Sequence, residues 1–522
     1  MLAITSVEAR RLALQSDLDA AKTQKERNRL GQFATPTLLA SDVLAYARTL
    51  LPANAPVRFL DPAFGTGSFY AALLSQFRVS RIEAAEGFEI DPHYGKPARK
   101  LWNGFPVNLT LGDFTRVTAP RESKRFNLII CNPPYVRHHH MDKTEKARLL
   151  AATTIACGVK MGGLAGLYCH FLGLADAWLA EDGIAGWLIP SEFMDVNYGR
   201  AVKRYLLERV ELLRIHRFDP NDLQFGDALV SSALVWFRKR RAEQGKGVEF
   251  SYGGTLAKPT HMRFLPTSAL QSSAKWSSLA SSGMKTTNNG FRLADFFSVK
   301  RGLATGNNGF FIMSRKEIEA RELPTEFFKP ILPGPRYLEK DVIEAEADGL
   351  PKIERQLFML DCRLPESEIK SRYPALWGYL ETGKPKVAGT YLCRHRKLWY
   401  AQEIRPPAPF ICTYMGRGLA KRVKPFRFIL NLSEATAANV YLLLYPKPLL
   451  KRALTNNPEL ARRIWKFLDS IPPDTLLAEG RVYGGGLYKM EPKELANVQA
   501  AEIAALLPMA ADRPASQLEM FH

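Results

Sequence analysis

Blocks of apolar and polar residues alternate along the first half of the chain and predict strands and helices in turn. Residues 7–30 are polar with a thin apolar stripe at helical spacing, which is typical of a surface helix. Residues 57–60 form a short apolar run that ends at Asp61, and Gly65-Thr66-Gly67 then leads into an apolar helix over 69–77. This order of strand, glycine loop and helix is the start of a βα unit.

The same alternation continues to residue 237. Further strands are predicted over 85–90, 126–131, 184–189 and 229–237, and a further helix over 167–179. Strands that alternate with helices favour an α/β fold with a mostly parallel, doubly wound, Rossmann-like sheet. Ligands of such sheets bind outside the carboxyl ends of the strands.

The length of 522 residues is too great for one ordinary core, so two domains are expected. A basic run begins a polar stretch at Arg238, and residues 270–290 are rich in Ser, Gly, Thr and Asn. We therefore expect a catalytic domain over 1–240, a linker region over 241–290 and a second domain over 291–522. The second domain reads as mixed α/β with a topology that its weak periodicity leaves open.

The charge balance is the unusual part of the composition. Hydrophobic residues (46%) and charged residues (24%) are at globular levels, but 72 Lys and Arg against 52 Asp and Glu give a net charge of +20. Such an excess favours a polyanionic partner, above all nucleic acid. The six cysteines form no C-x-x-C pair and the sequence shows no long apolar span, so we expect a reducing cytosol and no membrane.

A chemically specific motif follows the strand over 126–131, which ends at Asn132-Pro133-Pro134-Tyr135. The lone pair of an adenine amino group is delocalised into the ring and is a poor nucleophile. The Asn132 side-chain oxygen and the Pro133 carbonyl can each accept one N6 hydrogen, and the prolines hold the acceptors in place. Tyr135 offers an aromatic face to an extruded base. The alternative is a proline turn with Asn132 as a local cap and Tyr135 as core filler.

Further motifs surround this one in a fixed order. They are Gly31-Gln32-Phe33-Ala34-Thr35-Pro36, Asp61-Pro62-Ala63-Phe64-Gly65-Thr66-Gly67, Glu89-Ile90-Asp91-Pro92 and Gly112-Asp113-Phe114. With Asn132-Pro133-Pro134-Tyr135 they resemble the gamma class of DNA adenine-N6 methyltransferases, the group of the TaqI and Eco57I modification enzymes. The resemblance covers nearly the whole chain, is strong up to residue 240 and is patchy beyond it, where 301–307 and 484–492 resemble parts of the family's recognition domain.

The resemblance implies S-adenosylmethionine as cofactor and a set of residues that bind it: Thr35, Asp61, Ala63, Gly65, Gly67, Glu89, Asp113 and Phe114. Glu89 would hold the ribose hydroxyls, Asp113 would accept from the cofactor's adenine amino group, and Phe114 would pack on that ring. Thr35 and the Ala63 backbone would contact the methionine moiety, with Asp61 near its positive groups. For each carboxylate the alternative is a solvated loop residue or a helix cap.

A nicotinamide cofactor fits the glycine loop less well. Gly65-x-Gly67 lacks the third glycine of the dinucleotide fingerprint, because Tyr70 stands in its place. His138-His139-His140 does not indicate a metal site, since three successive side chains cannot all reach one ion, and methyl transfer needs no metal.

The resemblance also implies double-stranded DNA as substrate, with a flipped adenine stacked between Tyr135 and Phe225. The C-terminal half would be the DNA target-recognition domain. Residues 384–427 are rich in Lys and Arg, contain Glu403 as their one acid and are interleaved with aromatic residues, which favours a phosphate-contacting surface. The residues expected on DNA are Arg394, Arg396, Lys397, Arg417, Lys421 and Arg422.

Several other functions remain open at this stage. Related Asn-Pro-Pro-Tyr sites methylate RNA or protein glutamine, and an orphan epigenetic DNA methylase, a combined restriction and modification enzyme or an inactive DNA-binding scaffold would share the fold. The favoured interpretation is the modification half of a restriction-modification system, acting as a monomer on DNA beside a separate restriction endonuclease.

Overall fold

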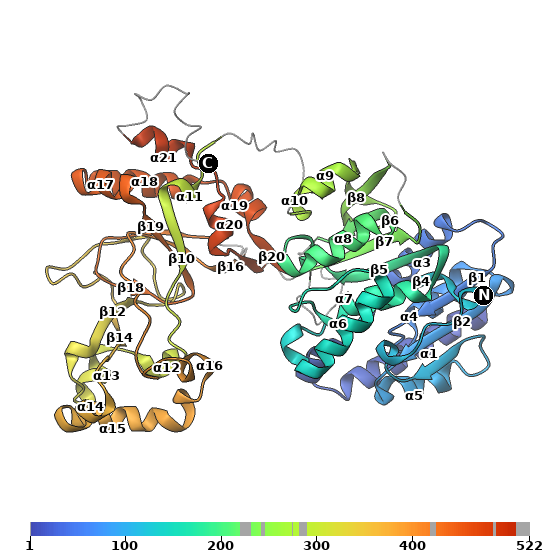
Figure 1. Ribbon diagram of the computed structural model, residues 1–522, viewed down its shortest axis with the longest axis horizontal. Helices are drawn as coiled ribbons and strands as arrows, with labels where there is room; N and C mark the ends of the chain where they lie inside the picture. The colour runs from blue at the N-terminus through green and yellow to red at the C-terminus, as the bar shows by residue number, and fades with distance from the viewer. Residues whose placement is uncertain are drawn as a thin grey trace. The chain divides into compact units, whose positions relative to one another are not determined.

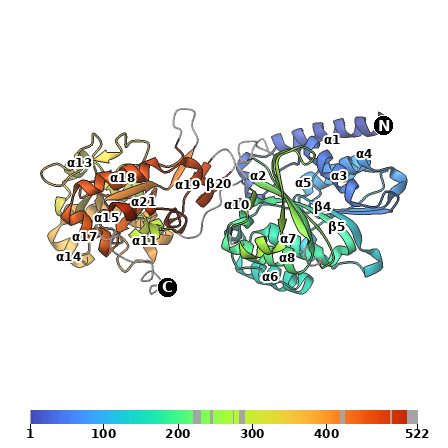
Figure 2. The same cartoon turned by 90° about the horizontal axis from the view of Figure 1, so that it is seen from above.

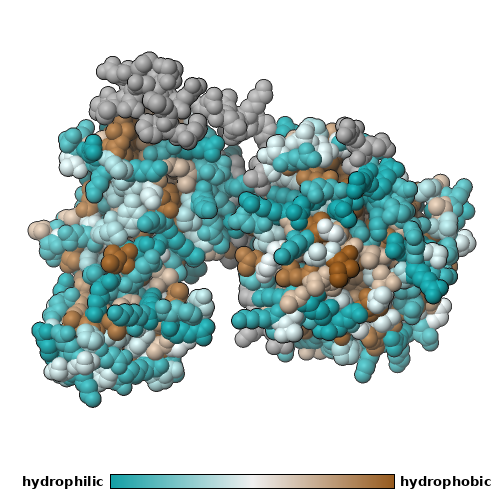
Figure 3. All heavy atoms as spheres, in the orientation of Figure 1, coloured by the Kyte–Doolittle hydropathy of each residue, from teal (hydrophilic) through white to brown (hydrophobic). Residues whose placement is uncertain are grey.

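A computed structural model describes residues 2–219, 231–241, 246–273, 275–280, 290–417, 424–483 and 487–507. The chain divides into two compact units, residues 1–284 with 483–485 and residues 285–482 with 486–522 (Figure 1). Hydrophilic residues cover most of the face drawn in Figure 3. Among the described residues, no helix combines the length and apolar character that crossing a bilayer requires.

The first unit is built on one large sheet whose strands, within the described ranges, lie in the order β3-β2-β1-β4-β5-β7-β6-β8-β9. Pairing is parallel from β3 to β5, and β7 is antiparallel to both of its neighbours. The strands are β1 (Val57–Asp61), β2 (Ile82–Glu89), β3 (Asn108–Leu111), β4 (Phe126–Cys131), β5 (Leu179–Pro190), β6 (Glu211–Arg217), β7 (Ser232–Arg238), β8 (Gly247–Gly254) and β9 (Pro259–Pro266).

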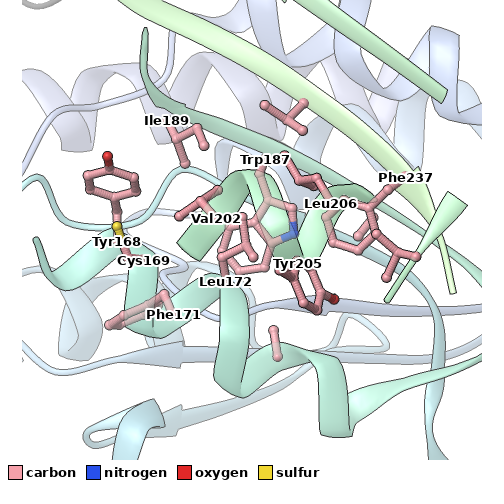
Figure 4. Close-up of a cluster of buried hydrophobic side chains, with 14 of the residues drawn as sticks. Tyr168, Cys169, Phe171, Leu172, Trp187, Ile189, Val202, Tyr205, Leu206 and Phe237 are labelled. Atoms are coloured by element: carbon pink, nitrogen blue, oxygen red, sulfur yellow. The ribbon is translucent and has the colours of Figure 1, made fainter. Parts of the chain in front are cut away.

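Helices cover both faces of this sheet because successive residues of its strands point to opposite sides. In β4, Leu128 and Ile130 belong to one buried cluster, and Ile129 and Cys131 belong to another. The first cluster packs against α3 (Thr37–Leu50), α4 (Ser68–Gln76) and α5 (Pro92–Leu101). The second packs against α6 (Lys143–Cys157), α7 (Leu167–Ala175) and α8 (Arg200–Glu208), and Figure 4 shows part of it around Trp187.

The predicted doubly wound sheet is therefore confirmed, with two differences. The expected linker over 241–290 contains β8 and β9, which extend the sheet, and the short helices α9 (Thr267–Ser272) and α10 (Ser277–Ala280). The expected surface helix over 7–30 is two helices, α1 (Leu2–Ala20) and α2 (Gln24–Leu30).

The second unit is mixed α/β, as predicted. Its two larger sheets have the strand orders β10-β19-β15-β17-β13 and β11-β14-β12-β18 in the described part of the chain. The first comprises β10 (Phe297–Arg301), β13 (Val342–Ile343), β15 (Phe410–Thr413), β17 (Phe428–Asn431) and β19 (Tyr441–Pro446). The second comprises β11 (Ile312–Met313), β12 (Phe328–Leu332), β14 (Leu357–Leu360) and β18 (Thr436–Ala437).

The helices of the second unit pack on these sheets. Ile464 and Leu468 of α18 share a buried cluster with the first sheet, and Ile369 and Leu376 share one with the second. The helices are α11 (Leu293–Phe296), α12 (Asn308–Phe311), α13 (Arg315–Ala320), α14 (Glu366–Arg372), α15 (Pro374–Gly383), α16 (Tyr391–Arg394), α17 (Pro448–Asn456), α18 (Glu459–Ser470), α19 (Pro473–Glu479), α20 (Pro492–Ala496) and α21 (Ala501–Leu506).

Candidate active site

The loops that follow β1, β2, β3 and β4 line one cavity of about 590 Å³ at the carboxyl edge of the parallel strands. Glu89, the last residue of β2, lines it together with Asp113 and Asn132, which belong to the loops after β3 and β4. Ala63 and Gly65 line it too, and with Asn132 they also line a second cavity of about 50 Å³. Residues that lie far apart in the sequence thus meet where the sheet topology predicts a ligand.

Asn132 is held in one orientation by the segment that precedes α3. Its Nδ2 donates to the Phe33 carbonyl at 3.0 Å and to Thr35 Oγ1 at 3.1 Å. These bonds use both hydrogens of the amide group, so the Asn132 Oδ1 is left as an acceptor. Thr35, which the family resemblance assigns to the methionine moiety of the cofactor, is buried and lines the small cavity.

A hydrogen bond and an aromatic contact of Tyr135 fix the remainder of the Asn-Pro-Pro-Tyr turn. The Tyr135 hydroxyl donates to the Leu188 carbonyl at 3.1 Å, and its ring centroid lies 5.8 Å from that of Phe33. Pro133 is buried, and Pro134 lines the large cavity, whereas Pro133 and Tyr135 do not. The four residues therefore form a rigid edge of the site, with Asn132 and Pro134 innermost.

Two buried carboxyl groups stand beside the glycine loop. Asp61 is 1% exposed, and its carboxylate accepts from the Ala63 amide at 3.1 Å. The Glu89 carboxylate accepts from the amides of Gly65 at 2.9 Å and Asp91 at 2.8 Å. Burial raises the pKa of Asp61 to about 8 and the pKa of Glu89 to about 7, because a charged carboxylate is poorly solvated there. Both groups thus titrate near neutral pH.

The glycine loop needs its glycines for different reasons. Both Gly65 and Gly67 have positive φ (55° and 91°), where side chains are disfavoured. A Cβ on Gly67 would lie 2.6 Å from Trp102 Nε1, so this position is closed by packing. A Cβ on Gly65 would meet no atom within 4 Å, so Gly65 leaves open space beside the cavity that it lines.

Asp113 and Phe114 lie in the cavity wall as expected, and Asp113 is also a cap. Its Oδ1 accepts from the Thr115 amide at 2.9 Å and the Thr115 hydroxyl at 2.7 Å, and its Oδ2 faces Arg116 Nε at 3.2 Å. Phe114 packs among aromatic rings, including Phe88 at 5.4 Å. The capping interpretation and the cavity position thus hold together for Asp113.

Several residues of the cavity wall were not predicted from the sequence. Gln15, Asp19, Lys22 and Tyr94 line it, and Asp91 lines it while capping α5 through the His93 amide at 2.9 Å. The one available signal was a polar stripe at four-residue spacing in α1, which by itself is typical of a solvated helix face.

Known families match both units of the chain. Residues 85–224 match the Eco57I restriction-modification methylase family, and residues 277–518 match the C-terminal domain of the Type II methyltransferase M.Eco57I. The chain belongs to the Eco57I family of modification methylases. The predicted resemblance is thereby confirmed, and this Eco57I-family protein is a type II restriction-modification methyltransferase.

Relatives of this Eco57I-family methyltransferase extend over most of its length. The Type II methyltransferase M.XamI of Xanthomonas campestris pv. amaranthicola is 28% identical over 92% of this chain and 86% of its own. M.AccI of Acinetobacter calcoaceticus is 25% identical over 92% of this chain and 87% of its own. The structure of the Type IIL restriction-modification enzyme MmeI in complex with DNA has a TM-score of 0.50 at 14% identity, covering 86% of this chain and 63% of that chain, which shows a shared fold.

The residues expected on DNA divide into three groups. Arg394 and Lys397 are exposed. Arg396 is half-buried, and its Nη2 donates to the Ala304 carbonyl at 2.8 Å, which ties residues 391–397 to the loop at 302–307. Arg417 ends strand β16 (Met415–Arg417), and the remaining predicted contacts lie outside the described residues: Phe225, Lys421 and Arg422.

Proposed function

We propose that this Eco57I-family protein transfers the methyl group of S-adenosylmethionine to N6 of an adenine that is flipped out of duplex DNA. The carrying observation is the orientation of Asn132, whose amide nitrogen is occupied by Phe33 and Thr35 while Oδ1 stays free to accept. The Asn132 Oδ1 can therefore accept a hydrogen bond from an exocyclic amino group, which offers two hydrogens.

The proposed chemistry assigns each acceptor a task. Asn132 Oδ1 and the Pro133 carbonyl accept the two N6 hydrogens, so that the nitrogen lone pair leaves the ring plane and becomes nucleophilic. The cofactor supplies an electrophilic methyl group on a positively charged sulfur. Tyr135, held by the Leu188 carbonyl, presents a fixed aromatic face to the base, an interaction of roughly 1 to 3 kcal/mol. Phe225 is proposed to stack on the opposite face of the base.

S-adenosylmethionine fits the residues of the large cavity. The Glu89 carboxylate is fixed by two backbone amides and keeps lone pairs for a ribose diol. Asp113 and Phe114 supply an acceptor and an aromatic surface for an adenine ring. The acidic side chains of the wall suit a cofactor with two cationic groups. We therefore propose that Thr35, Asp61, Ala63 and Gly65 lie beside its methionine portion, whereas Gly67, which lines neither cavity, serves the cofactor through the shape of the loop.

DNA contacts are proposed for the second unit as the target-recognition domain. The exposed Arg394 and Lys397 flank Arg396, which fastens them to the loop at 302–307. Exposed cations on phosphates position a protein on the duplex, while a neighbouring loop can reach base edges. We propose that these two segments form one DNA-contacting surface, that Arg417, Lys421 and Arg422 extend it, and that the protein acts as a monomer beside a separate endonuclease.

Methylation of unmodified plasmid DNA, followed by single-molecule sequencing, tests the proposed reaction. The wild type should modify adenines in one sequence context and leave an RNA and a glutamine-containing peptide unmodified. Asn132→Ala should lower the single-turnover rate on the order of 100-fold or more, as loss of a preorganised hydrogen-bonding group does elsewhere. Its S-adenosylmethionine affinity should stay within a few-fold of wild type. Near-wild-type methylation by Asn132→Ala, or modification of RNA or peptide alone, would overturn the proposal.

A further inference from the structure

Helix α1 packs against the rest of the first unit through a largely polar stripe of side chains. The residues that point inward recur every three or four positions, as one face of a helix requires, and include Val7, Glu8, Arg11, Gln15 and Asp19. Val7 is the apolar member of this stripe, and the half-buried Leu14 and Leu18 flank it. The helix lies outside the segment at 85–224 that matches the methylase family. Figure 2 shows α1 in side view as a long helix beside α4 and α5.

Arg11 is the buried centre of this contact, with 1% exposure. Its guanidinium donates to both carboxylate oxygens of Glu8 at 2.7 Å, which balances the buried charge. The remaining donors reach Thr66 Oγ1 at 3.2 Å, Ser68 Oγ at 2.9 Å and Thr37 Oγ1 at 3.2 Å. Thr66 and Ser68 belong to the glycine loop and the start of α4, so one side chain of α1 fixes the backbone that borders the cavity.

The C-terminal part of the stripe holds the loop after β2 in the same way. The Tyr94 hydroxyl of α5 donates to Asp19 at 2.8 Å, and the Lys22 ammonium pairs with Asp91. Asp91 in turn follows Glu89 by two residues. Helix α1 and the turn after it therefore connect the two loops that carry Gly65 and Glu89.

Gln15 stands between these two contacts. Its Oε1 accepts from the Thr66 hydroxyl at 2.6 Å, and the residue lines both cavities. Asp19 and Lys22 line the large cavity as well. Gln15 and Asp19 therefore both dock the helix and line the large cavity, and Lys22 lines it from the turn after the helix.

We propose that α1 and the turn after it form a wall of the S-adenosylmethionine pocket. In this wall Arg11 is a positioning residue for the glycine loop, and Gln15, Asp19 and Lys22 face the cofactor. This inference rests on the proposed cofactor. The supporting geometry is the Arg11 guanidinium of α1, which donates to the hydroxyls of Thr66 and Ser68. In the same loop the Gly65 amide donates to the Glu89 carboxylate.

Cofactor binding to the full-length protein tests the inference, with Arg11→Met as the variant and Arg10→Met as its matched control. Arg10 is the exposed neighbour on the same helix. Arg11→Met should raise the calorimetric Kd for S-adenosylmethionine at least about tenfold, the effect of losing roughly 1.4 kcal/mol. Hydrogen exchange of the amides at 63–68 should become faster. Arg10→Met should change neither, and duplex binding without cofactor should be equal in both.

The possible failures can be told apart. Absence of S-adenosylmethionine binding by the wild type would overturn the proposed function itself. Wild-type binding with an unchanged Kd and unchanged loop exchange in Arg11→Met would overturn the role of α1 alone. If Arg11→Met does not fold, Gln15→Met decides the matter. It removes the hydrogen bonds of Gln15 to Thr66 and Asp19 but leaves no buried charge unpaired, and it should still weaken cofactor binding without altering duplex binding.

Discussion

Substitution of Gly31 by Ala tests how the N-terminal segment supports the Asn-Pro-Pro-Tyr turn, the proposed catalytic turn. Gly31 has a φ of 64°, and its carbonyl accepts from the Tyr135 amide at 3.3 Å. A Cβ at this position would lie 2.4 Å from the Tyr135 nitrogen and 3.0 Å from the Pro134 carbonyl carbon. Since those neighbours are backbone atoms, the Asn-Pro-Pro-Tyr turn itself must move, by about 1 Å to restore ordinary contact.

Two separate costs follow from that substitution. The left-handed conformation costs an L-residue roughly 1 to 2 kcal/mol, whatever the surroundings. Displacement of the turn moves Asn132, and a misplacement of about 1 Å in a catalytic group can reduce the rate on the order of 100-fold. Gly104 is the matched control, because its φ is 85° and a Cβ there would meet no atom within 4 Å. Gly104→Ala should carry the first cost only.

Thermal unfolding and single-turnover methylation separate these costs. Both variants should unfold a few degrees below wild type, as about 1 kcal/mol implies for a unit of this size. Only Gly31→Ala should lose methylation on the order of 100-fold. If Gly31→Ala methylates DNA as fast as Gly104→Ala, the turn tolerates the added methyl group and the argument from contact is refuted.

Two further predictions concern charge. Burial raises the pKa of Glu89 to about 7 and the pKa of Asp61 to about 8, so both carboxyl groups ionise as the pH rises from 6 to 9. Calorimetry across that range should show the affinity for S-adenosylmethionine increasing, by at most tenfold per pH unit for each group. Both folded pKa values lie above the unfolded ones of about 4, so the stability of the ligand-free protein should fall from about pH 4 upwards and level off above about pH 8. A pH-independent cofactor affinity would contradict the placement of both carboxyl groups beside the cofactor. The double variant Arg394→Ala with Lys397→Ala should reduce the slope of log DNA affinity against log salt concentration by up to about 0.9 per lost phosphate contact. Arg396→Ala should also lower the melting temperature, because Arg396 is hydrogen-bonded to Ala304. Equal slopes for the wild type and the double variant would show that Arg394 and Lys397 do not contact DNA.

The position of the Asn-Pro-Pro-Tyr turn was predictable because its signal is local. A buried strand, Phe126–Cys131, runs directly into Asn132, and sheet topology alone places that junction at a ligand edge. Glu89 and Asp113 were assigned to the cofactor by the family resemblance, and the structure places both in the cavity wall, Glu89 at the end of β2 and Asp113 shortly after β3. The second role of Asp113 as a cap was foreseen only as an alternative, because one carboxylate can serve a backbone amide and a ligand at once.

The wall formed by α1 was beyond sequence reasoning for a physical reason. Helical periodicity is read from apolar residues, and the inward stripe of α1 is polar, so it resembles a face in contact with water. Arg11 and Thr66 are 55 residues apart, and nothing local in either segment announces the other. Strand β9 was missed for a related reason, since its Met262 and Phe264 are exposed and its alternation marks no buried face.

The hydrogen bonds that complete the pocket also set the order in which it can fold. Thr35 and Phe33 are joined to Asn132 across 97 and 99 residues, and Gln32 is joined to Asp91 across 59. During synthesis these N-terminal groups emerge well before their partners, and such long-range closures are slow steps in folding. A ligand that needs all of these contacts binds only the finished unit, so S-adenosylmethionine at concentrations above its Kd should stabilise that unit against unfolding as a nascent chain completes it.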